Sequence, residues 1–499
     1  MSHTITRHYV EVQGRRVHYR RCGKGPPVVM LHESPRSSVA LQGLMNQGPT
    51  DVTMLAFDTP GCGESEPLTT PHAEASDFAD AFADTLTALG IERAVVYGTH
   101  TGAAIAMAFA LRHARRVSRL VIDGIGVFDA AERAGILGSY LPPFVPAVDG
   151  THLVWLWSRL RDQYLFFPWN HRGVGARLWR PLPEPAFMQL AALDLLRAGD
   201  HYRAPYAAAF RYRPDRWLGD LRMPVFIGAR ADDMLLPHLD RLGEVPGNVR
   251  VETLSAERPR WAAALWAQMQ EGTEGLPDAG PVDAPALSAA RLTNAFVDCA
   301  AGRLHLRGAL GGSGRPLVLL HDSPGGARGL DRQARAVLSQ RPVLMPDLPA
   351  HGDSPAWAGM EDAACVAAAL HEVLAHIGLG EAEVEGRGVG SRVAAAMARL
   401  YPRRYRASPA DVAAPGTSAP GRVMARPDGG HLLAAWFHAR DEAILGPWWG
   451  RTMADHHDFG DALDIETIHA RSIERLKEAP QAAAMRAALL AEARAADRS

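Results

Sequence analysis

The stretch "VVYGTHTGAAIAMAFAL", residues 95–111, decides the fold. An apolar run typical of a buried strand leads into Gly98-Thr99-His100-Thr101-Gly102, and an alanine-rich run typical of a helix follows. This order predicts a sharp strand-to-helix turn, or elbow, that exposes one side chain at the carboxyl edge of a sheet, where pockets form in α/β proteins. Such an elbow normally presents Ser, Cys or Asp, whereas here it presents His100.

Composition bounds the class of protein. A length of 499 residues predicts more than one domain, and 47% hydrophobic with 22% charged residues is typical of a globular chain. The net charge of -2 gives no indication of a nucleic acid partner or an anionic membrane surface. The four cysteines form no CxxC pair, which disfavours disulfides and structural zinc. Without an apolar leader or a membrane-length apolar run, we expect a cytoplasmic protein.

The chain contains an internal repeat. The elbow recurs as Gly386-Arg387-Gly388-Val389-Gly390, in which Gly388 takes the place of His100. Three longer segments also recur: 28–38 as 317–327, 54–65 as 343–354 and, without a gap, 149–169 as 428–448. We therefore expect two copies of one architecture.

The repeat and the element pattern predict the domains. Apolar strands separated by helical stretches predict a mostly parallel sheet with helices on both faces. We expect a first domain over 1–272 with an aromatic-rich helical insertion at about 127–216, a Pro/Gly/Asp-rich linker at 273–290 and a second domain over 291–499. The second copy ends after its version of the insertion, and a proline interrupts its "RASPADV" segment (406–412). It is expected to be truncated and degenerate, and to pack against the first copy or form part of a homo-oligomer.

Three motifs support a family resemblance: His32-x-x-Pro35, Asp58-x-Pro60-Gly61-x-Gly63-x-Ser65 and the elbow. With them the sequence resembles the α/β-hydrolase superfamily, in the branch with a helical cap that includes epoxide hydrolases, haloalkane dehalogenases and meta-cleavage C–C hydrolases. The resemblance covers most of the first copy and about the first two-thirds of a hydrolase in the second. It implies an α/β-hydrolase fold with a helical cap, followed by a truncated, degenerate copy. In this family His32 and Asp58 are read as structural.

The resemblance also implies a catalytic site that departs from the family pattern. The family acid follows the strand after the cap, a position matched by Asp233 in "IGARADDMLLP". The family's general-base His is missing, because "NVRVETLSAERPRWAAALWAQM" passes from strand to helix without one. We predict that His100 pairs with Asp233, and that the N-terminus of the following helix lowers the pKa of His100.

The loop after the third strand supplies further candidates. Glu33 stands where the family usually has Gly; it could orient His100, accept a proton, spoil the oxyanion hole, or point away and bind loop amides. By position, the oxyanion donors would be the amides of Ser34 and Thr101. Trp155 and Phe167 of the aromatic insertion are predicted to line a pocket for an apolar substrate.

Several functions remain open from the sequence. The leading hypothesis is an enzyme acting on a small hydrophobic carbonyl-type substrate (ester, lactone or C–C bond), with His100 as nucleophile or base, Asp233 in support and no cofactor. A lyase that uses His100 as base is one alternative. Another is a pseudo-hydrolase that binds an apolar ligand or a protein partner. A metal site built from His100, Asp233, Glu33 and His32 is a further, weaker alternative, because no ligand spacing supports it.

Overall fold

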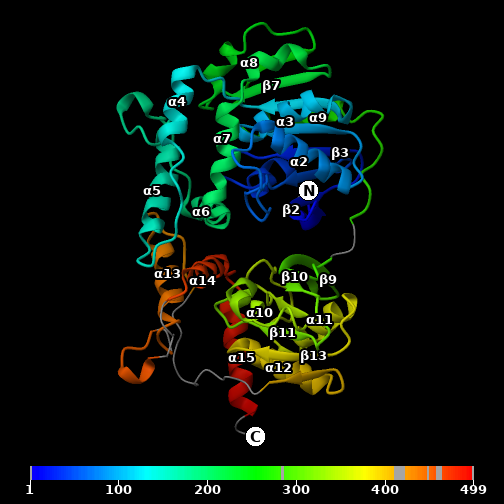
Figure 1. The fold of residues 1–499 in the computed structure, drawn as a ribbon, viewed down its shortest axis with the longest axis vertical. Coiled ribbons are helices and arrows are strands. Elements are labelled where there is room, and N and C mark those ends of the chain that lie inside the picture. The colour runs from blue at the N-terminus through cyan, green and yellow to red at the C-terminus, as the bar shows by residue number, and fades with distance from the viewer. Residues whose placement is uncertain (1–2, 283–285, 409–421, 447–448, 457–462, 497–499) are drawn as a thin grey trace. The chain divides into compact units, whose positions relative to one another are not determined.

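The computed structural model describes residues 3–282, 286–408, 422–446, 449–456 and 463–496 (Figure 1). These residues form two compact units. The first contains the chain up to residue 145 and residues 156–283, and the second contains residues 146–155 and 284–499. The short segment 146–155 thus belongs with the second unit, although the sequence places it inside the first domain's cap.

The first unit is built on an eight-stranded sheet with the order β1-β2-β4-β3-β5-β6-β7-β8. β1 and β2 are antiparallel, β2 also pairs antiparallel with β4, and every later pairing is parallel. The strands are β1 (Thr6–Val12), β2 (Arg15–Cys22), β3 (Pro27–Leu31), β4 (Thr53–Phe57), β5 (Ala94–Thr99), β6 (Val117–Asp123), β7 (Val225–Arg230) and β8 (Val249–Leu254).

Helices cover both faces of this sheet. Because successive strand residues face opposite ways, Val29 packs with α2 (Ala75–Ala88) and α3 (Thr101–Arg112), while Val28 packs with α1 (Gln42–Met45) and α9 (Arg258–Glu271). Between β6 and β7 the chain forms the predicted cap. Its helices are α4 (Ala130–Ser139), α5 (Thr151–Leu165), α6 (Pro185–Ala198), α7 (Arg203–Arg211) and α8 (Pro214–Trp217). Figure 1 shows α4, α6 and α7 to one side of the strands.

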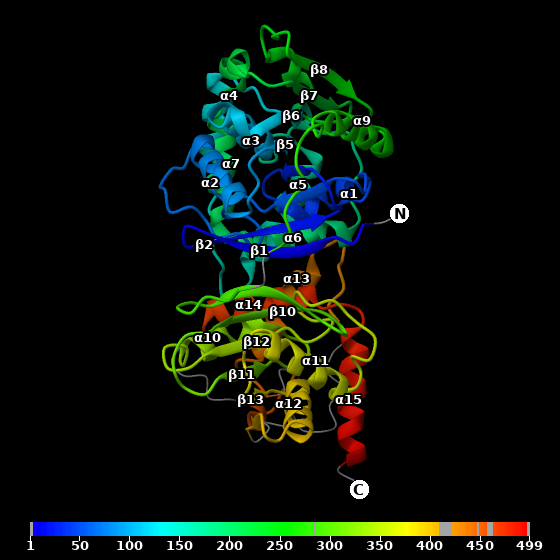
Figure 2. The same cartoon turned by 90° about the vertical axis from the view of Figure 1, so that its right-hand side faces the viewer.

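The second unit has a six-stranded sheet with the order β14-β13-β11-β12-β10-β9 (Figure 2). This order repeats that of the first six strands of the first unit, and nothing follows in the places of β7 and β8 within the described residues. The strands are β9 (Thr293–Cys299), β10 (Gly302–Ala309), β11 (Leu317–Leu320), β12 (Val343–Pro346), β13 (Ala382–Gly386) and β14 (Tyr405–Ala407). The helices are α10 (Asp331–Arg335), α11 (Ala363–His376), α12 (Val389–Leu400), α13 (Gly430–Asp441), α14 (Ile465–Lys477) and α15 (Ala482–Ala496).

Some of the features that predicted a degenerate second copy lie outside the described residues. β14 has three residues where β6 has seven, and residues 409–412 of the "RASPADV" segment are not among those described. The same holds for residues 447 and 448 at the end of the third repeat and for residues 283–285 of the predicted linker. The rest of that linker, 273–282 and 286–290, contains no helix or strand. None of the described helices is long and apolar enough to cross a bilayer.

Candidate functional site

The elbow between β5 and α3 has the backbone of a sharp, strained turn. His100 has φ 49° and ψ -107°, a conformation that costs a non-glycine residue on the order of 1–3 kcal/mol. The flanking glycines are required by close backbone contacts. A Cβ on Gly98 would lie 2.4 Å from the carbonyl oxygen of Gly102, and one on Gly102 would lie 2.3 Å from that of Leu31. The turn therefore holds the His100 side chain at the carboxyl edge of the sheet.

His100 meets the predicted acid directly. Its Nε2 lies 2.9 Å from Oδ2 of Asp233, which follows β7 and whose Oδ1 accepts a 2.8 Å hydrogen bond from the amide of Leu235. The side chains of His100 and Asp233 are 28% and 17% exposed. The acid thus contacts the elbow residue itself, where the family pattern has a histidine from the loop after the last strand.

The pair is charged at neutral pH. Burial acts to lower the pKa of His100, but the Asp233 carboxylate outweighs it and, with Glu33 and Asp123 nearby, raises the pKa to about 9. Burial acts to raise the pKa of Asp233, and His100 nevertheless lowers it to about 2. The prediction of a lowered pKa for His100 is therefore wrong, because the nearby carboxylates, Asp233 first among them, raise it.

A second acid, Asp123, was not recognised in the sequence. It ends β6, and its Oδ2 accepts hydrogen bonds of 3.1 Å from both Tyr97 Oη and Trp261 Nε1. Burial, followed by the charge of Asp233, raises its pKa to about 6. The next residue, Gly124, leaves space for the His100 ring, since a Cβ there would lie 2.9 Å from its Nε2. A carboxylate at the end of the strand beside the elbow was the signal that could have identified Asp123.

His100 opens into a pocket of about 210 Å³ under the cap. Glu33, Ser34 and Thr101 line this pocket together with His100. Phe167, which was predicted to line a pocket, lines it too. The other aromatic lining residues are Phe128, Tyr140, Tyr164, Tyr206 and Phe210. The walls of the pocket therefore combine aromatic and aliphatic side chains, and its charged groups lie at the elbow and at Arg36 and Arg180.

Trp155 does not line this pocket, so that prediction is wrong. α5 contributes Leu160, Gln163 and Tyr164 to the wall. At 100° per residue, Tyr164 lies on the opposite face of the helix from Trp155 and more than two turns further along. The presence of an aromatic residue in a cap helix does not indicate which face of the helix points to the pocket. This criterion was therefore too general to place Trp155.

One of the two predicted oxyanion donors is already hydrogen-bonded within the protein. The amide of Ser34 donates a 3.3 Å hydrogen bond to Thr101 Oγ1. Ser34 Oγ is buried and has no hydrogen-bond partner within the described part of the chain. His32 supports the loop, because its Nδ1 lies 2.8 Å from the carbonyl oxygen of Glu33 and its Nε2 accepts from the amide of Thr59. Glu33 lines the pocket and interacts electrostatically with His100, so its side chain does not point away from the site.

The corresponding elbow of the second unit is closed by a carboxylate. Gly388 has φ 48° and ψ -114°, almost the angles of His100. Asp322, which corresponds to Glu33, accepts hydrogen bonds at its Oδ1 from the amides of Ser323 (2.7 Å) and Val389 (2.9 Å). These amides correspond to the Ser34 and Thr101 oxyanion positions. A Cβ on Gly388 would lie 2.0 Å from Asp322 Oδ1, so the carboxylate fills the place of an elbow side chain.

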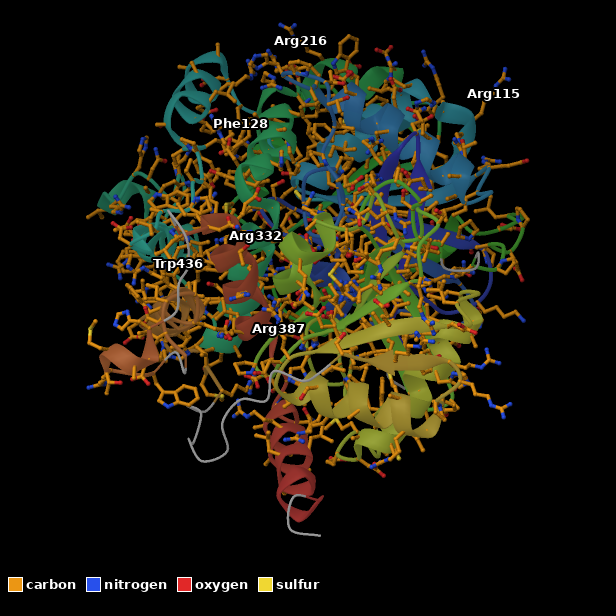
Figure 3. The ribbon with its side chains drawn as sticks, turned by 60° about the horizontal axis from the view of Figure 1, so that its bottom comes forward. Arg115, Phe128, Arg216, Arg332, Arg387 and Trp436 are labelled. Carbon is orange, nitrogen blue, oxygen red and sulfur yellow. The ribbon has the colours of Figure 1, made fainter. Side chains whose placement is uncertain are left out.

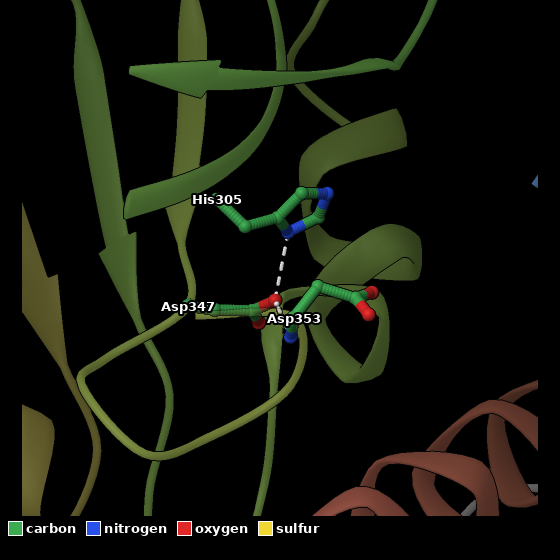
Figure 4. A group of neighbouring side chains, drawn as sticks. All are labelled: His305, Asp347 and Asp353. Atoms are coloured by element: carbon green, nitrogen blue, oxygen red, sulfur yellow. Dashed lines mark hydrogen bonds and ion pairs between the residues drawn. The ribbon is translucent and has the colours of Figure 1, made fainter. Parts of the chain in front are cut away.

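One group in the described residues has the spacing of metal ligands: His305, Asp347 and Asp353 (Figure 4). Its oxygens are already engaged. Asp347 accepts from His305 Nδ1 and from the amides of Ala327 and Asp353, while Asp353 Oδ2 accepts from Lys477 Nζ at 2.7 Å. In the first unit Asp58 makes the same three kinds of contact, with His18 Nδ1 and the amides of Ser38 and Glu64. The group is therefore a structural network common to both sheets.

Comparison with known proteins agrees with the fold of the first unit. Residues 26–247 match the family model described as alpha/beta hydrolase fold. The match, together with the sheet order and the capped pocket, shows that the first unit has the α/β-hydrolase fold.

Three curated relatives show how varied the similar proteins are. The chain is 35% identical over 117 residues to a proline iminopeptidase of Xylella fastidiosa, covering 22% of this chain and 36% of the relative. It is 34% identical over 135 residues (26% and 43%) to a 2-hydroxy-6-oxononadienedioate/2-hydroxy-6-oxononatrienedioate hydrolase 2 of Pseudomonas putida. It is 31% identical over 122 residues (24% and 42%) to a soluble epoxide hydrolase of a Corynebacterium species. The chain thus spans less than half of each relative's length, and their names describe three different reactions.

Proposed function

We propose that the first unit is an enzyme that cleaves a bond beside the carbonyl group of a small, mainly apolar substrate, such as an ester, a lactone or a C–C bond. The observation that carries this proposal is the His100–Asp233 pair at 2.9 Å, held on a strained elbow at the base of an aromatic pocket. Strain of this kind persists where the surrounding structure enforces it, and it concentrates at functional sites. The relative named 2-hydroxy-6-oxononadienedioate/2-hydroxy-6-oxononatrienedioate hydrolase 2 supports hydrolysis of an oxo compound.

The protonation state of His100 decides its role. With a pKa of about 9, only about 1% of His100 is neutral at pH 7, so direct attack by the imidazole is a minor route. An imidazolium donates from both ring nitrogens; Nε2 faces Asp233, and Nδ1 is left to donate to a substrate oxygen. His100 thus stabilises negative charge on the carbonyl oxygen and can pass a proton to the leaving group. The Ser34 amide, one of the two predicted oxyanion donors, already donates a hydrogen bond to Thr101 Oγ1. The positive charge of His100 therefore adds to what the amides can provide.

Glu33 supplies the complementary base. Its carboxylate lines the same pocket and interacts with the charge of His100. In hydrolysis, Glu33 takes a proton from water as the water oxygen bonds to the carbonyl carbon, and the leaving group departs with a proton from His100. In a lyase reaction, Glu33 would instead remove a proton from carbon. In both routes Asp233 keeps the His100 ring oriented and charged.

The test is turnover of a panel of aryl esters, lactones and 1,3-diketones by the wild-type chain and by His100→Ala and Glu33→Gln. We expect turnover of at least one class, and loss of that turnover in both variants. The matched control is His113→Ala, because His113 is 27% exposed and contacts Asp80 at 2.8 Å, at the other end of α3. Turnover that survives His100→Ala would refute the proposed role of His100.

A pseudo-hydrolase that binds an apolar ligand is the second candidate. It is favoured by the absence of an alcohol or thiol at the central position of the elbow, where His100 stands, and of a histidine between β8 and α9. It predicts saturable binding of aromatic carbonyl compounds in the pocket without turnover of any member of the panel. Binding of this kind would remain after His100→Ala, since the aromatic and aliphatic side chains of the pocket would still contact the ligand.

A further inference from the structure

The second unit retains a cleft under its own cap helices. It has a volume of about 740 Å³, larger than the 210 Å³ pocket of the first unit. Its walls come from α10, the elbow, the end of α13 and the start of α14, all within the second unit. A cavity of this size holds an ordinary small molecule.

This cleft corresponds in part to the catalytic pocket. The gap-free repeat pairs Gln163 with Glu442 and Tyr164 with Ala443. The helices α6 and α14 correspond through one shared ion pair: Arg197 binds Glu64 in the first unit, and Lys477 binds Asp353 in the second. Continuing that register pairs Ala191 with Arg471. The replacements remove an aromatic ring and add a guanidinium and a carboxylate, so the cleft is wider than the catalytic pocket and is lined by charged rather than aromatic side chains.

Cations outnumber anions around this cleft. Arg332, Arg387 and Arg471 line it, and Figure 3 labels the first two. Arg387 donates a 3.1 Å hydrogen bond to the neutral side chain of Gln333. The lining carboxylates are Glu442 and Asp464, and Asp464 also caps α14 through the amide of Glu466.

Glu442 is shared between two arginines. Its Oε2 lies 3.3 Å from Arg471 Nη1 and 3.1 Å from Nη2 of Arg475, a residue only 2% exposed. The Nε of Arg475 is buried without a hydrogen-bond partner in the described residues. Burial, first of all, lowers the pKa of Arg471; Glu442 and Asp464 act to raise it, while Arg387 and Arg475 act to lower it further. A further negative charge in the cleft would therefore be attracted by these neighbouring guanidinium groups.

We propose that the cleft formed by α10, α13, α14 and the Arg387 elbow is a binding site for a small multiply charged anion, most simply a phosphate-bearing molecule. Planar guanidinium groups bind phosphate and carboxylate oxygens through paired hydrogen bonds, and clusters of them select ligands with two or more negative charges. The apolar residues Leu330 and Ile468 line the same cleft and provide a surface for an organic part of the ligand. The second unit, whose elbow is closed by Asp322, thus has a binding role that is independent of the reaction proposed for the first unit.

The test is isothermal titration of the full-length chain with inorganic pyrophosphate, in phosphate-free buffer with the ionic strength held constant by NaCl. Citrate is titrated in parallel to distinguish a phosphate from a polycarboxylate ligand. We expect saturable 1:1 binding of pyrophosphate, weakened about tenfold or more in Arg387→Ala and in Arg332→Ala. Both side chains are exposed, so these variants should fold. Arg471→Ala, which restores the residue of the first unit, should abolish binding.

The control is Arg403→Ala, which removes an exposed arginine just beyond α12, at the opposite end of that helix from Arg387. It should leave the affinity unchanged. Stronger binding of citrate than of pyrophosphate would correct the ligand from phosphate to polycarboxylate. Absence of saturation by either anion, or equal losses in Arg387→Ala and Arg403→Ala, would overturn the proposal. Neither outcome bears on turnover by the first unit, so the two proposals fail separately.

Discussion

The two elbows of this protein have nearly the same backbone and opposite chemistry. His100 and Gly388 differ by 1° in φ and 7° in ψ, and each precedes a helix of twelve residues. In the first unit the turn carries a charged ring that faces a pocket. In the second it carries no side chain, and Asp322 satisfies the two amides that an oxyanion would need. The conformation of the turn therefore does not define a catalytic site; the side chains around it do.

The comparison also shows where strain is retained. Gly388 adopts its positive φ at little cost, whereas His100 adopts the same angle against the preference of every non-glycine residue. A residue at this position could relieve the strain by becoming glycine, as in the second unit. The retention of histidine, paired with Asp233, is the structural reason to assign a function to the first elbow.

The largest expected effect tests the first elbow. His100→Ala should lower kcat/KM on the substrate identified in the panel by about 1000-fold, which corresponds to about 4 kcal/mol of transition-state stabilisation. The loss follows from removing both the proton donor and the positive charge. Steady-state kinetics check it, with His113→Ala expected within about twofold of wild type. Equal activity of the two variants would show that His100 is not required, and the first elbow would then have no functional difference from the second.

The next effect tests the second elbow. Gly388→Ala should destabilise the second unit by about 3 kcal/mol for two reasons. The new Cβ would lie 2.0 Å from Asp322 Oδ1, and the alanine would have to adopt a positive φ. Gly378→Ala is the matched control: it has φ 81° in the same unit and open space around the Cβ position, so it should cost only about 1 kcal/mol. Urea unfolding gives both values. Similar costs at the two sites would show that Asp322 does not fill the elbow.

A smaller effect separates the two roles of Asp322. Asp322→Ala should cost about 2 kcal/mol, since it leaves the buried amides of Ser323 and Val389 without an acceptor. Asp322→Asn should cost much less, because its amide oxygen can still accept both hydrogen bonds and burial already raises the pKa of the native carboxyl group. Thermal unfolding compares the two variants. A larger loss of stability in Asp322→Asn than in Asp322→Ala would contradict the role of Asp322 as acceptor for these two amides.

The smallest effect concerns pH. If the imidazolium of His100 is the active form, kcat/KM should fall about tenfold between pH 8 and pH 10, as expected for a pKa of about 9. Because the folded-state pKa is raised, the ion pair stabilises the fold fully below about pH 6.5, and this contribution is lost as pH rises through about 9. The lowered pKa of Asp233 has the opposite sign: its contribution is lost as pH falls from about 4 through about 2. Activity that rises above pH 8 would instead indicate a neutral His100.

The sequence predicted those features that depend on local pattern. The elbow and the position of the cap followed from the sequence pattern. The partnership of His100 with Asp233 followed from the family resemblance, which placed the acid after the strand that follows the cap, and from the fact that parallel strands bring their carboxyl ends to one edge. The charge of His100 did not follow, since it depends on Asp233, Glu33 and Asp123 surrounding one ring. Trp155 was wrongly assigned to the pocket because the face of α5 on which it lies was not considered. The role of Asp322 could be recognised only in the structure, because no repeating sequence pattern indicates the direction of a side chain in a loop.

The most direct test of a functional first elbow is the pKa of His100 itself, measured by NMR titration of the chain labelled with ¹³C-histidine. His100→Gln identifies the signal among the 21 histidines. A pKa of about 9 in the wild type that falls to near 6.5 in Asp233→Asn is the predicted result. A pKa near 6.5 in both proteins would contradict the charged pair and, with it, the assignment of His100 as the group that acts on the substrate.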